Sequence, residues 1–473
     1  MLFHSSTFAV FFALTYALYV SLRHRQQNVL LLVASYVFYG YWDWRFLSLL
    51  AASTLLDYFC ALAIQGSDHP PARRRFLALS LCGNLGMLGF FKYAGWFAGS
   101  LQVLAARFGW HIDAFTLDVV LPVGISFYTF QTMSYVIDVY RRQMPATRNL
   151  LDFAVFVSFF PQLVAGPIER AASLLLQVER PRRVTETQFY QGIWLVFFGL
   201  FKKVFIADNM APIVDRAFAA GSAPSGVEVV VAVYAFAFQI YGDFSGYSDI
   251  ARGISKLMGF ELMVNFRMPY FARNPREFWR RWHISLSTWL RDYLYISLGG
   301  GRHGTARTYV NLMLTMILGG LWHGAAWTFV LWGFYQGVLL VGHRSLSPAI
   351  AALRRAFGPA EGLWTVLSIV VTLQFVCLGW LIFRGESVAQ IVDYLRSIVF
   401  AFGDPSVVLG DVARIAFYVL PLLVLELYQE AIGNLHAIDR LDWRVRGLVY
   451  FVMAVLLASG GASGGQEFIY FQF

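Results

Sequence analysis

The sequence predicts an all-helical protein that crosses a membrane many times. Of its 473 residues, 58% are hydrophobic and only 14% are charged, whereas soluble domains contain about 25% charged residues. Apolar stretches recur along the chain, and many are long enough to cross the roughly 30 Å hydrocarbon core of a bilayer as a helix. We expect about ten to twelve crossings plus re-entrant helices in one integral-membrane domain, residues 1–458. A flexible linker and aromatic tail, residues 459–473, would follow it.

The expected elements follow the apolar pattern. In the first half, the spans are 7–22, 29–41, one ending near residue 64, 76–97 and 119–139. In the second half, they are 189–206, 227–241, one or two within 308–340, 363–383, 412–427 and 448–458. The stretch 153–164 is too short to cross and is interrupted by Pro161. We interpret it as a re-entrant piece, because irregular backbone at membrane depth must be covered by protein or line a water-filled cavity.

Arginines between the first expected spans predict the orientation. Most of them fall on one side, namely Arg23, Arg25, Arg73, Arg74, Arg75, Arg141, Arg142 and Arg148. Arg45 and Arg107 fall on the other side. Basic loops stay in the cytoplasm, so the N-terminus is expected outside. The same rule explains the excess of 37 Lys and Arg over 28 Asp and Glu without a nucleic acid partner.

Two neighbouring stretches concentrate polar chemistry in this apolar chain. Residues 277–300 mix arginines, His283 and serines with tryptophans and tyrosines, and residues 318–324 place His323 in an otherwise apolar helix. Ionisable groups at membrane depth are costly and indicate function by default. Residues 279–295 are amphipathic rather than spanning. They form either an interfacial helix or the lining of an inner vestibule, and both interpretations can hold.

His323 is the best candidate for catalysis. A lone histidine on an apolar helix is usually a satisfied core residue, but the glycines around it would let a second chain or a ligand come close. Burial disfavours the charged imidazole and leaves a nitrogen to accept a proton. No second histidine has metal-ligand spacing, and Cys60, Cys82 and Cys377 are interpreted as small core residues, so no metal site is expected. A general base acting on a hydroxyl fits best. Six histidines near termini or loops are interpreted as solvated, namely His4, His24, His69, His111, His343 and His436, whereas His303 could have a role.

The central motifs resemble those of a known family. The motif at 278–300 reads Phe-Trp-Arg-Arg-Trp-His-Ile-Ser-Leu-Ser-Thr-Trp-Leu-Arg-Asp-Tyr-Leu-Tyr-Ile-Ser-Leu-Gly-Gly, and Gly-Gly-Leu-Trp-His-Gly stands at 319–324. Together with motifs at 121–128, 160–167 and 243–249, they are similar to the membrane-bound O-acyltransferase family, especially its bacterial alginate O-acetylase branch. The resemblance implies a bundle around a central tunnel, with His323 as the catalytic histidine and His283 as a second active-site histidine.

The resemblance also implies a reaction and its participants. Acetyl groups from cytoplasmic acetyl-CoA, with no resident cofactor, would cross the bacterial inner membrane and O-acetylate an exported polysaccharide of alginate, peptidoglycan or cellulose type. A periplasmic SGNH-type esterase or transferase would place the acetyl group on the polymer. A transporter or flippase would also have broken helices and buried ionisable groups, but no inverted repeat is evident. A structural subunit of a polymer-export complex is the third hypothesis.

Two further groups have open interpretations. Arg280 and Arg281 would either meet the phosphates of coenzyme A or anchor the helix among anionic lipid headgroups. Near the C-terminus, residues 466–473 read Gln-Glu-Phe-Ile-Tyr-Phe-Gln-Phe. The tail would either anchor at the bilayer surface or present Tyr470 as an acyl carrier. The second interpretation follows from its resemblance to the C-terminal Phe-x-Tyr-Phe motif of related acyl-transfer systems.

Overall fold

The computed structural model describes residues 1–110, 120–358, 360–462 and 468–469, and all regular secondary structure in these ranges is helical. Seven helical segments among them are long and apolar enough to cross a membrane. They are His24–Gln65, Pro70–Arg107, Glu186–Phe218, Gly226–Leu257, Glu361–Arg384, Pro405–Ile432 and Trp443–Gly460. The predicted all-helical, multi-pass class is therefore confirmed, whereas the total of ten to twelve crossings stays a prediction.

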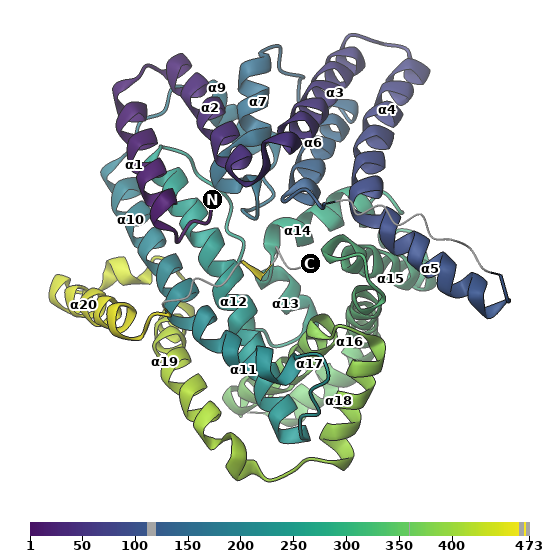
Figure 1. Ribbon diagram of the computed structural model, residues 1–473, viewed down its shortest axis with the longest axis vertical. Coiled ribbons are helices and arrows are strands. Elements are labelled where there is room, and N and C mark those ends of the chain that lie inside the picture. The colour runs from purple at the N-terminus through teal and green to yellow at the C-terminus, as the bar shows by residue number, and fades with distance from the viewer. Residues whose placement is uncertain (111–119, 359, 463–467, 470–473) are drawn as a thin grey trace. The chain divides into compact units, whose positions relative to one another are not determined.

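The chain forms two compact units (Figure 1). Unit 1 comprises residues 1–196 and 251–263, and unit 2 comprises residues 197–250 and 264–473. The helices of unit 1 are α1 (Ser6–Ser21), α2 (His24–Asp43), α3 (Leu47–Gln65), α4 (Pro70–Leu88), α5 (Ala94–Arg107), α6 (Ile125–Tyr140), α7 (Leu150–Ser158), α8 (Phe160–Leu163), α9 (Ala171–Glu179) and the first part of α10 (Glu186–Leu200).

Within unit 1, the stretch expected to be re-entrant is a broken helix. α7 ends at Ser158 and α8 begins at Phe160, and Pro161 stands in the first turn of α8. Proline has no backbone N–H to donate, so a chain break just before it leaves no hydrogen bond unmade. Phe156 and Phe160 are fully buried. The backbone of this stretch is thus covered by protein, as the sequence pattern predicts.

Unit 2 contains the following elements. They are the π-helix η3 (Phe201–Ala207), α11 (Asp208–Phe218), α12 (Gly226–Leu257), η4 (Pro269–Phe271), α13 (Pro275–Arg281), α14 (Ile284–Trp289), η5 (Leu290–Tyr295), α15 (Gly304–His323), α16 (Trp327–Ala356), α17 (Glu361–Arg384), α18 (Val388–Phe400), η6 (Pro405–Val408), α19 (Leu409–Ile432), η7 (Ala437–Arg440) and α20 (Trp443–Gly460). The C-terminal end of α12, from Ala251, belongs to unit 1.

The polar motif at 243–249 lies inside α12, which corrects the expectation that the span ends at residue 241. A helix can continue through acidic residues at this depth when each acid has a basic partner. Lys202 lies 2.9 Å from Asp249, and Lys203 lies 2.9 Å from Asp243. These pairs neutralise the charges of the motif, so the helix does not need to reach water there.

The middle of the stretch 279–295 is buried. The stretch forms three short pieces, α13, α14 and η5, instead of one amphipathic helix. Trp282, His283 and Leu286 are each at most 1% exposed, whereas Arg280 and Arg291 are exposed. The buried part fits the lining of an interior site, and the interfacial interpretation stays a prediction.

Candidate active site

His283 lies at the break between two short helices. α13 ends at Arg281, α14 begins at Ile284, and His283 between them has a φ of +41°. Left-handed backbone costs a residue other than glycine about 1–3 kcal/mol, and such strain is concentrated at functional sites. Backbone hydrogen bonds hold it: Ile284 donates to the carbonyl of Asn265, and Arg267 donates to that of Arg281, both at 2.9 Å.

The tautomer of His283 follows from its hydrogen-bond partner. Its Nδ1 lies 3.1 Å from Oδ1 of Asn265. The same Asn265 atom accepts from the backbone N–H of Ser285 at 3.2 Å. A backbone N–H can only donate, so this atom is the amide oxygen and not the amide nitrogen. An oxygen of this kind only accepts, and Nδ1 of His283 therefore has the proton and Nε2 has the lone pair.

Burial keeps His283 neutral. The residue is 0% exposed and lies outside the seven candidate spans. Removal from water disfavours the imidazolium and lowers the pKa of His283 to about 3. At physiological pH the side chain is therefore a neutral imidazole with a defined tautomer, suited to accepting a proton or a hydrogen bond.

His323 is the last residue of α15, not a residue within a longer span as the sequence suggested. Extended backbone at Gly324 ends the helix before α16 begins at Trp327. His323 is 5% exposed. The carbonyl groups at a helix C-terminus lack intrahelical partners, and the helix dipole there favours a positive charge. A positive charge on the imidazole of His323 would be favoured at this position.

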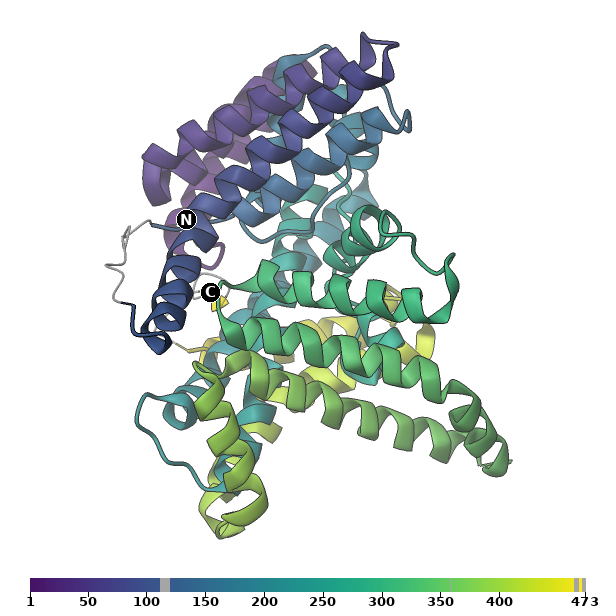
Figure 2. The ribbon, with the colours of Figure 1, turned by 90° about the vertical axis from the view of Figure 1, so that its right-hand side faces the viewer.

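The glycines near His323 admit a neighbouring helix rather than a ligand. A Cβ on Gly320 would collide with the carbonyl oxygen of Phe329, and one on Gly324 would collide with the Phe329 ring. A Cβ on Gly333 of α16 would meet the carbonyl oxygen of Met316 in return. The close approach of α15 and α16, which lie side by side in Figure 2, depends on these glycines and fixes the end of α15.

Aromatic rings surround His323. The ring centroids of Trp322 and Trp332 each lie 5.1 Å from that of His323, and that of Phe383 lies 5.4 Å away, all nearly perpendicular. The Trp322 ring also lies 5.9 Å from the ring of His283. The two histidines selected from the sequence therefore contact the same indole, in a part of unit 2 that is rich in buried rings. Such surroundings limit access of water and strengthen electrostatic interactions.

Arg280 and Arg281 line a basic cavity of about 560 Å³. Its wall also includes Arg267, Arg273, Arg276 and His343. Arg281 donates to Glu277 and to Glu430, each at 2.8 Å, and the bond to Glu430 raises its pKa. Arg280 is exposed. Arg281 thus stabilises the wall of the cavity, while Arg280 is the better candidate of the two for contacting an anion.

Tyr470 lies outside the described residues, but the two residues before it are described. Phe468 is 2% exposed and Ile469 is 3% exposed. The ring of Phe468 lies 6.0 Å from that of Phe244, which lies 4.7 Å from His283. In Figure 1, this short yellow segment is seen beside α12. At Phe468 and Ile469 the tail is buried in unit 2 next to the histidine site and is not exposed on the surface of the protein.

Sequence reasoning missed several residues of this site. Asn265 fixes the orientation of His283, yet it stands in a loop without any local pattern that predicts such a contact. Asp243 stands in the polar motif at 243–249, and Lys203 stands near the end of the expected span 189–206. Their pairing joins elements forty residues apart, which a single sequence does not reveal.

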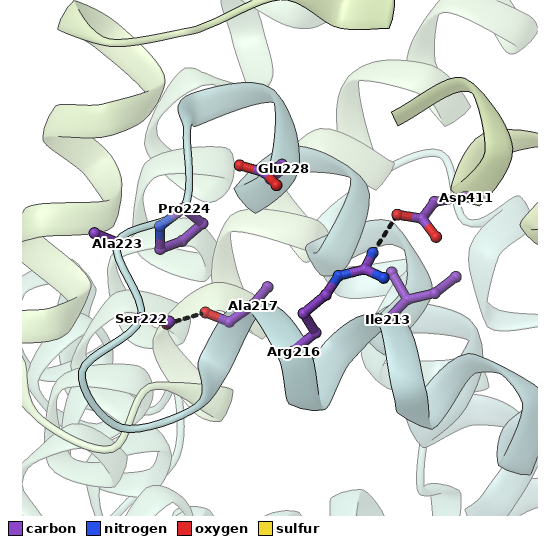
Figure 3. Close-up of a pocket in the computed structure, with 8 residues that line it drawn as sticks. All are labelled: Ile213, Arg216, Ala217, Ser222, Ala223, Pro224, Glu228 and Asp411. Atoms are coloured by element: carbon purple, nitrogen blue, oxygen red, sulfur yellow. Dashed lines mark hydrogen bonds and ion pairs between the residues drawn. The ribbon is translucent and has the colours of Figure 1, made fainter. Parts of the chain in front are cut away.

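A second cavity is a weaker candidate. It has a volume of about 220 Å³ and is lined by residues of α11, the start of α12 and the start of α19. In Figure 3, Arg216 is paired with Asp411, and Ser222 donates to the carbonyl of Ala217. Glu228 accepts from the hydroxyl of Ser225. These polar groups have partners within the wall, and none of them is a histidine or a thiol.

The site and the helical fold define the class of this protein, and a family comparison agrees. Residues 141–380 match the model of the membrane-bound O-acyltransferase family. This chain belongs to that family. It is a multi-pass membrane O-acyltransferase, located in the bacterial inner membrane, and the comparisons do not favour the transporter or structural-subunit hypotheses.

Individual relatives extend the comparison. A probable alginate O-acetylase of Pseudomonas putida is 41% identical over the full length of both chains. A probable alginate O-acetylase of Azotobacter vinelandii is 45% identical, covering 85% of this chain and 79% of its own. A peptidoglycan O-acetyltransferase of Helicobacter pylori is 35% identical, covering 78% of this chain and 73% of its own. The similarity extends well beyond the central motifs.

Proposed function

We propose that this enzyme takes acetyl groups from cytoplasmic acetyl-CoA, moves them across the inner membrane and supplies them for O-acetylation of an exported polysaccharide. The main support is the placement of His283 and His323 against one indole inside an aromatic site. The names of the relatives indicate acetyl as the acyl group, and alginate or peptidoglycan as the type of acceptor.

The chemistry assigns a different role to each histidine. His323 accepts the proton of the attacking hydroxyl while the hydroxyl oxygen bonds to the acetyl carbonyl carbon. Collapse of the tetrahedral intermediate breaks the carbon–sulfur bond, and the imidazolium returns the proton to the leaving thiolate. His283, neutral and fixed by Asn265, orients the donor or the acceptor through Nε2. A water-poor site limits hydrolysis of the thioester.

The basic cavity is the proposed entry of the donor. Coenzyme A is a polyanion, and the wall has more arginines than acids although Arg273 and Arg281 are paired with wall glutamates. Arg280→Ala should raise the apparent KM for acetyl-CoA about two- to fivefold, as expected for one exposed charge pair. Arg291→Ala is the control, because Arg291 is paired with Asp292 and is not part of this wall. An unchanged KM in Arg280→Ala would favour the lipid-anchor interpretation.

Tyr470 is the proposed first acceptor. Burial of Phe468 and Ile469 beside the histidine site supports this proposal over a surface anchor. A phenol, with a pKa of about 10, is a better leaving group than a sugar hydroxyl, so an acetyl-tyrosine retains transfer potential. A periplasmic SGNH-type partner would then pass the acetyl group from Tyr470 to the polymer, which never enters the membrane.

The decisive test of the general base is His323→Ala. General-base assistance contributes about 10² to 10⁴-fold, so polymer-bound acetate should fall to near background at equal protein level in the membrane. His303→Ala is a matched control, because His303 precedes the first residue of the same helix and is exposed. Normal acetylation by a well-expressed His323→Ala protein would refute the assignment.

The carrier proposal has its own test. Tyr470→Phe keeps the ring and removes only the hydroxyl, so it should abolish both polymer acetylation and the acetyl adduct on the C-terminal peptide, measured by mass spectrometry. Tyr190→Phe, at a residue 63% exposed in unit 1, should leave both unchanged. Full acetylation by Tyr470→Phe would leave the tail as an anchor.

A further inference from the structure

Asp243 on α12 joins the C-terminal tail to a buried ion-pair cluster. Its Oδ1 lies 2.9 Å from Nζ of Lys203, and its Oδ2 accepts a hydrogen bond of 2.6 Å from the backbone N–H of Ile469. Lys203 also lies 2.8 Å from Asp208. A hydrogen bond to an ionised carboxylate is shorter and about twice as strong as a neutral one. The tail is thus held through its backbone by a charge inside the protein.

The same face of α12 contacts the side chain of Phe468 in the tail. Asp243 and Tyr247 are four residues apart and lie one above the other on the helix. The ring of Tyr247 lies 4.7 Å from that of Phe468. One turn of α12 therefore contacts two successive tail residues, one by an aromatic ring and one by a backbone hydrogen bond.

A second contact fixes the tail where it leaves α20. Asn209 donates to the carbonyl of Gly460 at 2.9 Å, and Ala462 donates to the carbonyl of Val204 at 3.2 Å. A Cβ on Gly460 would lie 2.9 Å from the ring of Phe205, so the chain passes close to η3. Lys203 belongs to η3 as well. Both contacts are made to elements that surround the Lys203 cluster.

We propose that Asp243 is a positioning residue, and that its carboxylate docks the tail of the same chain, at Phe468 and Ile469, next to the histidine site. This inference deepens the proposed function and rests on it for the role of Tyr470. Recognition is through the backbone at Ile469 and through an aromatic ring at position 468. The side chain at 469 can therefore be changed while docking is retained.

The sharpest test is Asp243→Asn, which is nearly isosteric. An ammonium only donates, so Lys203 takes the single oxygen of the new amide, and the NH₂ group then faces the N–H of Ile469 as donor against donor. Lys203 keeps Asp208 as its counter-ion, so the substitution leaves no buried ammonium without a carboxylate. The substitution is thus directed at the tail contact rather than at the fold. Asp249→Asn is the matched control on the same helix, because Asp249 pairs with Lys202.

Docking is measured by the rate at which a water-soluble maleimide labels Ile469→Cys in a Cys82→Ser background, since Cys82 is the exposed native thiol. We expect slow labelling in the parent and in Asp249→Asn. In Asp243→Asn, labelling should be about tenfold or more faster, because the tail loses one hydrogen bond to a charged group. Polymer acetylation should fall in parallel in Asp243→Asn.

The outcomes separate this inference from the proposed function. Unchanged labelling in Asp243→Asn, or fast labelling in the parent, overturns docking by Asp243. Faster labelling with full polymer acetylation overturns the positioning role. If Asp243→Asn releases the tail while Tyr470→Phe still acetylates the polymer, docking by Asp243 stands, and the carrier role of Tyr470 is what fails.

Discussion

His283 and His323 contact the same indole but are held in opposite ways. His283 has a strained backbone and a polar partner, Asn265, that fixes its tautomer. His323 ends a regular helix and is surrounded by the rings of Trp322, Trp332 and Phe383. The first arrangement fixes the direction of a lone pair. The second limits access of water and would favour a positive charge on His323 at a helix C-terminus.

This difference indicates a division of labour. A group that orients a substrate needs a defined hydrogen-bond direction, which a polar network provides. A general base must change its charge during the reaction, and a rigid polar partner is not required for that. The two histidines should therefore respond differently when their surroundings are changed, and three experiments test this.

The largest effect is expected from Gly320→Val, which disturbs the helix that ends at His323. The new side chain would collide with the backbone of α16 at Phe329, and backbone cannot move aside as a flexible side chain can. Overpacking of this kind costs about 1–3 kcal/mol or more. We expect a lower melting temperature in detergent and loss of most polymer acetylation. Gly342→Val, on α16 with open space around it, should behave as the parent. Parent-like melting of Gly320→Val would contradict the packing explanation.

A smaller effect is expected from Asn265→Ala, which removes the partner of His283 and leaves the rings around His323 in place. A buried group that loses its hydrogen bond costs about 1–3 kcal/mol, so acetylation per folded molecule should fall about 10- to 100-fold. Asn149→Ala is a suitable control, because it removes a helix cap in unit 1. It should lower stability by about 1 kcal/mol without lowering acetylation per folded molecule. Equal activity in both variants would remove the role assigned to Asn265.

The smallest effect close to neutral pH is a pH dependence of stability, which grows as the pH falls. The pKa of His283 is about 3 in the folded protein and about 6.5 in an unfolded chain, so on acidification the unfolded chain binds the proton first. The contribution of His283 to the free energy of unfolding is fully present above about pH 6.5. It is lost as the pH falls toward 3, by up to about 1.4 kcal/mol per pH unit. His283→Gln should show a shallower acid-side decrease in melting temperature than the parent, and His303→Gln should not. Identical acid-side slopes in His283→Gln and the parent would exclude His283 as a source of the pH dependence of stability.

Much of the fold could be predicted from local patterns. Apolar length identified most of the long helices, and Pro161 identified the break between α7 and α8, because both signals are local. The continuation of α12 through Asp243 and Asp249 could not be predicted, since its cause is pairing with lysines on another element. Local sequence shows a charge but not its partner.

The candidate site was predictable in part. His323 and His283 were selected because ionisable groups stand out in an apolar chain, and both are buried against Trp322. The positive φ of His283 and its contact with Asn265 depend on how a distant loop meets α14, which no spacing rule describes. The glycines near His323 were recognised, but only the structure assigns their space to α16.

The paired lysines and acids also constrain how the chain is made. Lys202 and Lys203 are synthesised before Asp243 and Asp249, which lie in the next long helix. A lysine or aspartate that enters the bilayer centre alone costs about 2.5–3.5 kcal/mol. If segment 186–218 moved into lipid first, Lys202 would wait there without Asp249, whereas Lys203 would have Asp208 of its own segment. Insertion of this segment together with 226–257 as a helical hairpin avoids that cost, because Lys202 and Asp249 then leave the translocon as a pair.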